Sequence, residues 1–309
     1  MADGNTLLLV GGELCERTAE MLDPAHWRCI GLRRRARPAA DGRIAWHAAD
    51  LRNRETLSFL SAKEFSRISH ILYAPAPDAR TMADYAETYP FGLLRLLDSL
   101  APRCRTRLRR CVLVGSSAVW GPSSDWVDED TPPDGTDFRA RALLDAEAAL
   151  RTALPPGIGV ALRLSGLYGP GRLRLAERLR AGTIAAPDGP GHWANRLHIH
   201  DAARACAHLL TMADPQPLYI GTDDHPLPTA ELYDAIARLA GGPPPARQPR
   251  PPSGKRLSNA RLRASGWAPT WPNALDGYAA CLAESNGIAA GITAGRDPRG
   301  ENASEGQGK

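Results

Sequence analysis

The sequence predicts a doubly wound α/β fold, in which a mostly parallel sheet carries helices on both faces and a small C-terminal lobe follows. In the first half of the chain, short apolar runs alternate with longer amphipathic stretches. The runs are continuously apolar, as is typical of parallel strands buried on both faces, and their alternation with helices favours this class. We expect strands over residues 6–10, 29–32, 68–74, 111–114 and 160–164, with helices over 89–100 and 138–153.

The pattern changes after Gly171, where a Pro- and Gly-rich stretch interrupts the alternation. Beyond this stretch we expect helices over residues 201–212 and 228–240, with a strand over residues 218–221 between them. From residue 286 the chain is rich in small and polar residues with few apolar anchors, which predicts disorder. We therefore divide the chain into a sheet domain over 1–170, a lobe over 171–285 interleaved with the last sheet strands, and a disordered tail over 286–309.

Composition excludes several classes of protein. The chain has 309 residues, of which 43% are hydrophobic and 23% charged, as in globular proteins. It contains no run of eighteen apolar residues, so we expect no membrane partner. The N-terminal segment has no basic region of a signal peptide, and the six cysteines lack metal-binding spacing, so we expect a cytoplasmic protein without a bound metal. The net charge of +4 and the arginine clusters come without interleaved aromatic residues, so we predict no nucleic-acid partner.

The first expected strand leads directly into Gly11 and Gly12 and then into a helix. This order opens a Rossmann fold, where glycines let a pyrophosphate approach backbone N–H groups at the helix N-terminus. The spacing is degraded, because Val10 and Cys15 stand where the first and third glycines of G-x-G-x-x-G would fall. Glu13 also places a carboxylate near the expected phosphates. The loop alone is equally consistent with nucleotide binding and with an ordinary strand–helix turn.

The second expected strand ends in Arg33, Arg34 and Arg35. Sites that prefer NAD usually carry an acidic residue here for the ribose 2′-hydroxyl, whereas arginine accommodates a 2′-phosphate. The arginines therefore favour NADP over NAD as the cofactor, and a solvated run of charges is the alternative. Asp50 stands where a carboxylate can accept a hydrogen bond from the adenine amino group, although it could equally cap a helix.

Several segments along the chain together resemble the extended short-chain dehydrogenase/reductase superfamily. The resemblance is greatest to its NAD-dependent epimerase/dehydratase branch, in an atypical form, and covers about residues 6–283. The segments that carry it are Val10-Gly11-Gly12, Ala49-Asp50-Leu51, Tyr73-Ala74-Pro75-Ala76, residues 114–121 (VGSSAVWG), 162–171 (LRLSGLYGPG), 195–201 (NRLHIHD) and 256–262 (RLSNARL).

The resemblance implies roles for individual positions. Ser116, with Ser117 as the alternative if the register slips by one, matches the residue that polarises the substrate carbonyl or hydroxyl. The implied cofactor-binding residues are Gly11, Gly12, Leu14, Arg33, Arg34, Asp50, Leu51, Ala74, Pro75 and Ala76. The residues implied to line the substrate cleft are Tyr168, Arg172, Asn195 and Arg196. The resemblance also implies a small-molecule substrate and a possible homodimer formed through helices at about 82–100 and 138–153.

One departure from the family is decisive for the chemistry. The family's base is a tyrosine activated by a lysine four residues later, and no Y-x-x-x-K is present in this chain. Aligning the helix on residues 144–147 places Arg139 at the tyrosine and Leu143 at the lysine. Arg139 could bind substrate or stabilise an oxyanion, but its high pKa makes it a poor base.

Tyr168 and His198 are the remaining candidates for moving the proton. Packing under the YGPG turn is the alternative role for Tyr168, and a structural hydrogen bond is the alternative for His198. We expect His198 and His200 to share one face of an extended segment that precedes a helix capped by Asp201.

The sequence therefore predicts an NAD(P)-dependent oxidoreductase or epimerase-like enzyme that acts on a small polar or sugar-like carbinol or carbonyl substrate. Two alternatives stay open. One is a non-catalytic nucleotide-binding sensor or scaffold that has lost the dyad. The other is an interaction module that binds no nucleotide.

Overall fold

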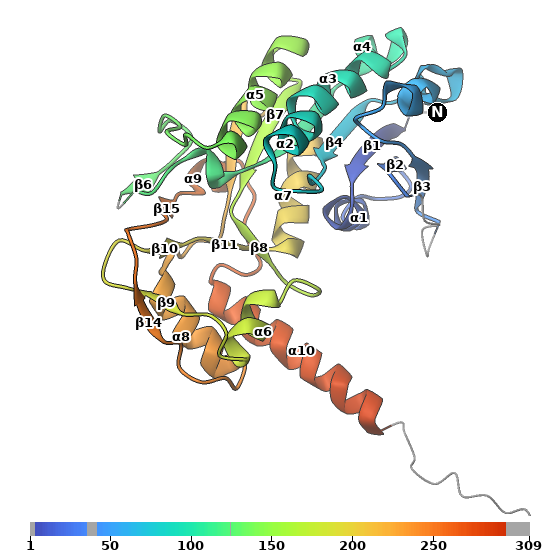
Figure 1. Ribbon diagram of the computed structural model, residues 1–309. Helices are drawn as coiled ribbons and strands as arrows, with labels where there is room; N and C mark the ends of the chain where they lie inside the picture. The colour runs from blue at the N-terminus through green and yellow to red at the C-terminus, as the bar shows by residue number, and fades with distance from the viewer. Residues whose placement is uncertain (1–3, 36–41, 124, 295–309) are drawn as a thin grey trace, which may run out of the picture.

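The computed structural model describes residues 4–35, 42–123 and 125–294. Its centre is a seven-stranded sheet in the order β12-β7-β5-β4-β1-β2-β3, in which every neighbouring pair is parallel (Figure 1). The predicted doubly wound Rossmann fold is confirmed. The strands are β1 (Asn5–Gly11), β2 (Trp27–Arg33), β3 (Ile44–Ala48), β4 (His70–Ala74), β5 (Arg110–Ser116), β7 (Gly159–Leu164) and β12 (Leu218–Gly221).

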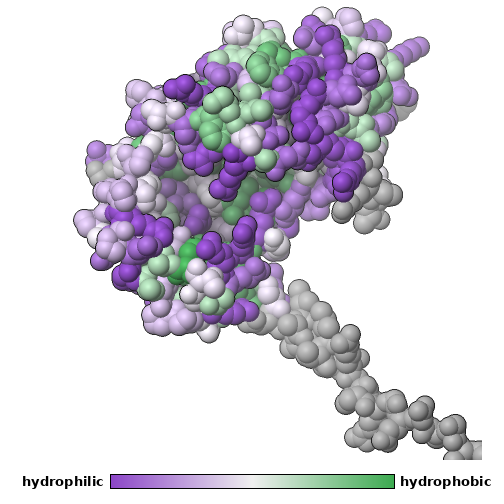
Figure 2. Space-filling view, in the orientation of Figure 1, coloured by the Kyte–Doolittle hydropathy of each residue, from purple (hydrophilic) through white to green (hydrophobic). Residues whose placement is uncertain are grey.

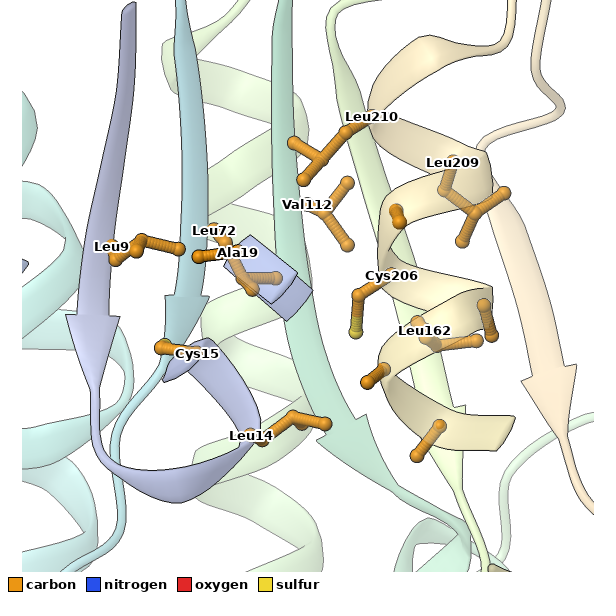
Figure 3. Packing of buried hydrophobic residues seen from close by; sticks show 14 of the residues in the cluster. Leu9, Leu14, Cys15, Ala19, Leu72, Val112, Leu162, Cys206, Leu209 and Leu210 are labelled. Atoms are coloured by element: carbon orange, nitrogen blue, oxygen red, sulfur yellow. The ribbon is translucent and has the colours of Figure 1, made fainter. Parts of the chain in front are cut away.

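Both faces of the sheet are buried, because successive side chains of a strand point to opposite faces. In β1, Leu7 and Leu9 belong to one core cluster, whereas Leu8 and Val10 belong to another. The first cluster packs under α1 (Glu13–Glu20) and α7 (Ile199–Thr211), as Figure 3 shows. The second packs under α3 (Pro90–Ser99), α5 (Phe138–Ala153) and the 3-10 helix η1 (Arg54–Ser61). This double burial explains the continuously apolar strand sequences.

The edge strand β3 was missed by the sequence analysis. Only Ile44 of this strand is fully buried, so the strand lacks the apolar run that marks the central ones. Its Trp46 lies against Gly31 of β2, where a Cβ atom would come within 2.2 Å of the indole ring. The glycine therefore lets the tryptophan lie flat on the neighbouring strand, beside the end of β2.

The lobe has its own core, in which Tyr168 and Tyr278 stack with their ring centroids 4.3 Å apart. Helices α6 (Arg174–Arg180), α8 (Thr229–Leu239) and the first turns of α10 (Ala274–Ala294) surround this pair. Between them, α7 and β12 return to the central sheet (Figure 1). Four two-stranded sheets pair β8 (Gly166–Tyr168) with β11 (Arg196–His198), β9 (Ala186–Asp188) with β14 (Arg247–Pro249), β10 (Trp193–Ala194) with β13 (Leu227–Pro228), and β6 (Trp126–Val127) with β15 (Arg256–Leu257).

The remaining helices are short. They are η2 (Lys63–Phe65), α2 (Met82–Thr88), α4 (Pro102–Arg107), η3 (Ser117–Val119) and α9 (Ala260–Ala264). In α3, one of the helices implied in dimer formation, Phe91 and Leu94 are exposed, and the homodimer stays a prediction.

The C-terminal boundary differs from the prediction. Helix α10 continues to Ala294, so the disordered tail expected from residue 286 is wrong for residues 286–294. The rest of that tail lies outside the described residues. Among the residues described, no helix is long and apolar enough to cross a membrane.

Candidate functional site

A pocket of about 770 Å³ opens at the carboxyl ends of β1, β2 and β4. The strand order reverses between β1 and β4, and open α/β sheets bind their ligands at such a switch point. Figure 2 shows mostly hydrophilic residues over the face of the molecule that it presents. Eight of the ten predicted cofactor-binding residues line the pocket. They are Gly11, Gly12, Arg33, Arg34, Asp50, Leu51, Pro75 and Ala76.

Leu14 and Ala74, the other two predicted cofactor residues, do not line the pocket. Leu14 belongs to the buried face of α1, and the Ala74 carbonyl lies against Gly11. The sequence analysis did not single out three further residues that line the pocket, which are Arg52 and Asp78 in loops and Thr88 at the end of α2.

The two glycines of the turn have different structural tasks. Gly11 has a φ of 144°, and a Cβ there would lie 2.4 Å from the Ala74 carbonyl oxygen, so only glycine fits. Gly12 caps the N-terminus of α1, and a Cβ there would meet nothing within 4 Å. Cys15 is fully buried beside Gly11, in the place where a third glycine would bring helix and strand together. The turn thus keeps a backbone cradle despite its degraded motif.

The acidic side chains at the start of α1 are paired with arginines. Glu13 accepts hydrogen bonds from Arg17, whose Nε lies 3.0 Å away, and from Arg172, whose Nε lies 2.7 Å away. Glu16 is paired with Arg33. These contacts neutralise both carboxylates beside the pocket.

The arginines of the pocket form a network with carboxylates. The Arg33 guanidinium stacks on the Trp46 ring at 3.5 Å, and Arg34 pairs with Asp78. Arg52 approaches Asp78 at 3.4 Å and holds Asp50 at 2.9 Å. The hydrogen bond from Arg52 lowers the pKa of Asp50, which keeps this carboxylate ionised as a hydrogen-bond acceptor.

Ser116 ends β5, and Ser117 begins the short helix η3. The Ser116 hydroxyl accepts the N–H of Ala118 at 3.2 Å, and both serines are half-buried. Ser116 pairs in register with Leu164 of β7, so it lies at the same carboxyl edge of the sheet as the pocket. Neither serine lines the pocket itself.

Arg139 and Leu143, which the sequence alignment places at the family's tyrosine and lysine, both lie on α5. Arg139, in the first turn of α5, donates to Asp137, the N-cap residue of that helix. Leu143 is 3% exposed and packs in the core with Val119 and Trp120. That these two residues stand at the family's tyrosine and lysine positions stays a prediction of the sequence alignment.

Tyr168 and His198 lie together in the lobe, with their ring centroids 5.3 Å apart. Their exposures are 0% and 6%, and burial raises the pKa of Tyr168 and lowers that of His198. His198 Nδ1 accepts the N–H of His200 as the N-cap of α7, and its Nε2 lies 3.4 Å from the Cys281 Sγ. These contacts favour the structural roles left open for both residues.

The expectation for the segment after His198 is wrong in two respects. His200 lies in the first turn of α7 and not in an extended segment. Asp201 does not cap this helix, because its carboxylate accepts the backbone N–H groups of Thr270 and Trp271 at 2.7 and 2.9 Å. Nothing in the local sequence indicates these distant partners.

The predicted substrate-cleft residues lie in different places. Arg172 contacts α1, as described above, whereas Arg196 lies on β11. The Asn195 side chain donates to the Lys255 carbonyl at 2.7 Å and accepts the Leu257 N–H at 2.8 Å. The Lys255 ammonium, which the sequence analysis did not consider for the site, donates to the Trp120 carbonyl, and burial lowers its pKa to about 8. The described residues contain no cluster of three metal-ligating side chains.

Solved structures with this architecture come from several bacteria. A protein of Methylobacillus flagellatus, provisionally named a NAD-dependent epimerase/dehydratase, is 31% identical with a TM-score of 0.75, covering 92% of this chain and 100% of that one. A Thermus thermophilus UDP-glucose 4-epimerase in complex with NAD is 22% identical with a TM-score of 0.72, covering 91% of this chain and 99% of that one. A Thermotoga maritima UDP-glucose 4-epimerase with UDP-glucose is 16% identical with a TM-score of 0.74, covering 92% and 99%. These last two likenesses support the fold alone.

A comparison with curated proteins found no match. The model of the NAD dependent epimerase/dehydratase family matches residues 9–221, more than two thirds of the chain. The match includes the glycine turn, Ser116 and the YGPG segment. The chain belongs to the NAD-dependent epimerase/dehydratase family.

Proposed function

We propose that this protein binds a nicotinamide dinucleotide with the adenosine half in the pocket at the switch point. The observation that carries the proposal is the cradle at Gly12, where open space beside a helix N-terminus suits a pyrophosphate. Asp50 would then accept a hydrogen bond from the adenine, and Pro75 and Ala76 would border the ribose nearer the nicotinamide. The complex of the Thermus thermophilus epimerase with NAD supports this assignment by analogy of fold.

The charge of the pocket favours NADP over NAD. Among the described residues that line it, four are arginines and two are aspartates. Arg33 is the last residue of β2 and Arg34 follows it, where the ribose 2′-position of a dinucleotide lies in this fold. Their present partners Glu16 and Asp78 are only moderately buried, so a 2′-phosphate can compete for the guanidinium groups.

The double substitution Arg33→Ala and Arg34→Ala tests this preference. We expect the Kd for NADPH to rise by at least about tenfold, or ~1.4 kcal/mol, because a charge-assisted contact to the 2′-phosphate is lost. The Kd for NADH should change by less than about twofold. Nicotinamide fluorescence during titration measures both constants, with Arg105→Ala, an exposed position on α4, as the control. Equal losses for both nucleotides would remove the arginines from the 2′-phosphate site.

For chemistry, we propose an oxidoreductase or epimerase-like reaction on a small polar or sugar-like substrate. A bound nicotinamide would supply hydride transfer, and Ser116 at the end of β5 would hold the reacting oxygen. Arg139 can stabilise negative charge on that oxygen, but it cannot act as the base. The buried contacts of Tyr168 and His198 leave neither of them well placed to move the proton.

A second candidate function is a non-catalytic nucleotide-binding sensor or scaffold. It is favoured by Leu143, which replaces the family's lysine and is packed in the core. One assay distinguishes the two functions. It measures reduction or oxidation of the nicotinamide in the presence of a panel of polyols, aldoses and nucleotide sugars. Turnover that Ser116→Ala abolishes would support the enzyme. Tight nucleotide binding without turnover across the panel would support the sensor or scaffold.

A further inference from the structure

One ion pair joins the glycine turn to the lobe. Glu13, the first residue of α1, accepts a hydrogen bond at 2.7 Å from the Nε of Arg172, which lies 159 positions later in the chain. Arg172 follows the YGPG segment, where Gly169 and Gly171 have φ values of 139° and 76°, and its N–H donates to the Gly169 carbonyl at 2.8 Å. The turn thus directs the arginine back onto the start of α1.

Glu13 borders the position at which the proposed function places the pyrophosphate, because its neighbour Gly12 lines the pocket, although Glu13 and Arg172 do not line it themselves. It is the first residue after Gly12, and Arg17 and Arg172 both donate to it. An anion at a helix N-terminus is stabilised by the free N–H groups and the helix dipole, and two guanidinium groups suit a phosphate as well as a carboxylate. The Glu13 and Arg172 side chains are 33% and 40% exposed, so their pairing is weak enough to exchange with a ligand.

We propose that Glu13 is an internal competitor of the cofactor pyrophosphate, and that Arg172 changes partner from Glu13 to the phosphate when the dinucleotide binds. This inference rests on the proposed function. The exchange couples occupancy of the cofactor site to the loop at Gly169–Arg172, which begins the lobe. Glu13 thereby lowers the affinity for the cofactor. The change of partner of Arg172 links binding of the cofactor to the position of the lobe.

Four proteins test the exchange, namely the wild type, Glu13→Gln, Arg172→Ala and the double variant, each titrated with NADPH. If Arg172 changes partner, Glu13→Gln tightens NADPH binding by about tenfold, because the carboxylate no longer competes and the arginine is already free. In the wild type, Arg172→Ala should then lower the affinity for NADPH by less than about twofold. The variant loses the contact of Arg172 with the phosphate, but it also has no ion pair to break when NADPH binds. In the Glu13→Gln background the same substitution should lower the affinity for NADPH by about tenfold.

Two controls locate the effect. Glu20→Gln, at the far end of α1, should leave NADPH affinity unchanged. Titration with 2′-AMP, which has no pyrophosphate, should give the same Kd for the wild type and Glu13→Gln. Thermal unfolding of each variant should stay near that of the wild type, because both side chains are partly exposed.

Three results would overturn the inference. If Arg172→Ala weakens binding in the wild type but has no effect beside Glu13→Gln, the arginine only shields the carboxylate. If Glu13→Gln leaves NADPH binding unchanged while the wild type binds, Glu13 is not a competitor and only this inference fails. If none of the four proteins binds NADPH, NADH or 2′-AMP, the proposed function fails with it.

Discussion

Replacing Glu147 by Ala is expected to lower the free energy of unfolding by about 3–5 kcal/mol. Glu147 on α5 and Arg163 on β7 form a two-pronged ion pair with N–O distances of 2.8 and 2.7 Å, and their side chains are only 2% and 4% exposed. Arg163 also lies over the Trp120 ring at 4.4 Å. Loss of the carboxylate leaves a buried guanidinium without its partner, which costs more than the pair itself contributes. Urea unfolding followed by circular dichroism measures the change.

The matched control is Asp145→Ala, an exposed position on the same helix, which should change stability by less than about 0.5 kcal/mol. The double variant Glu147→Leu with Arg163→Met should be more stable than either single variant, because it removes both charges together. A loss below about 1 kcal/mol for Glu147→Ala would contradict the account of this pair. The pair matters for the site because it fixes α5 beside β7, the neighbour of the strand that ends in Ser116.

Replacing Gly12 by Val is expected to weaken NADPH binding by about 100-fold or more, or ~2.7 kcal/mol, without unfolding the protein. A Cβ at Gly12 meets no atom within 4 Å, so there is open space for a side chain at this position. The same open space is where a pyrophosphate would approach the N-terminus of α1. Fluorescence titration measures the affinity, and thermal unfolding checks the fold.

The neighbouring glycine gives the opposite result. Gly11→Ala should destabilise the fold by about 2–4 kcal/mol, because its φ is 144° and its Cβ would collide with the Ala74 carbonyl. Affinity close to that of the wild type for Gly12→Val would place the ligand elsewhere and contradict the site.

Much of the fold could be predicted because it depends on local pattern. The helix over 138–153 and the strand over 218–221 were predicted to the residue, since an amphipathic period and a short apolar run mark them. Strand β3 was missed because an edge position needs no continuous apolar run. The helical extension to Ala294 was missed because composition alone suggested disorder there.

The candidate site could be predicted only in part. The turn at Gly11 and the arginines from Arg33 onward were visible, because each stands at the end of an apolar strand and so is marked in the local sequence. The partners Asp78 and Arg52, and the contact of Arg172 with Glu13, come from segments far apart in the sequence. Long, flexible charged side chains pair according to the packing of loops, which no local pattern encodes.

The claim that this pocket binds a nicotinamide dinucleotide is tested most directly by titrating the wild-type protein with NADPH and NADH. Nicotinamide fluorescence gives the Kd for each nucleotide under the same conditions. We predict saturable binding of both, with one molecule per chain and a lower Kd for NADPH. A lower Kd for NADH would keep the pocket and overturn the role of the arginines. Absence of binding for both would contradict the account and favour a module that interacts through its surface alone.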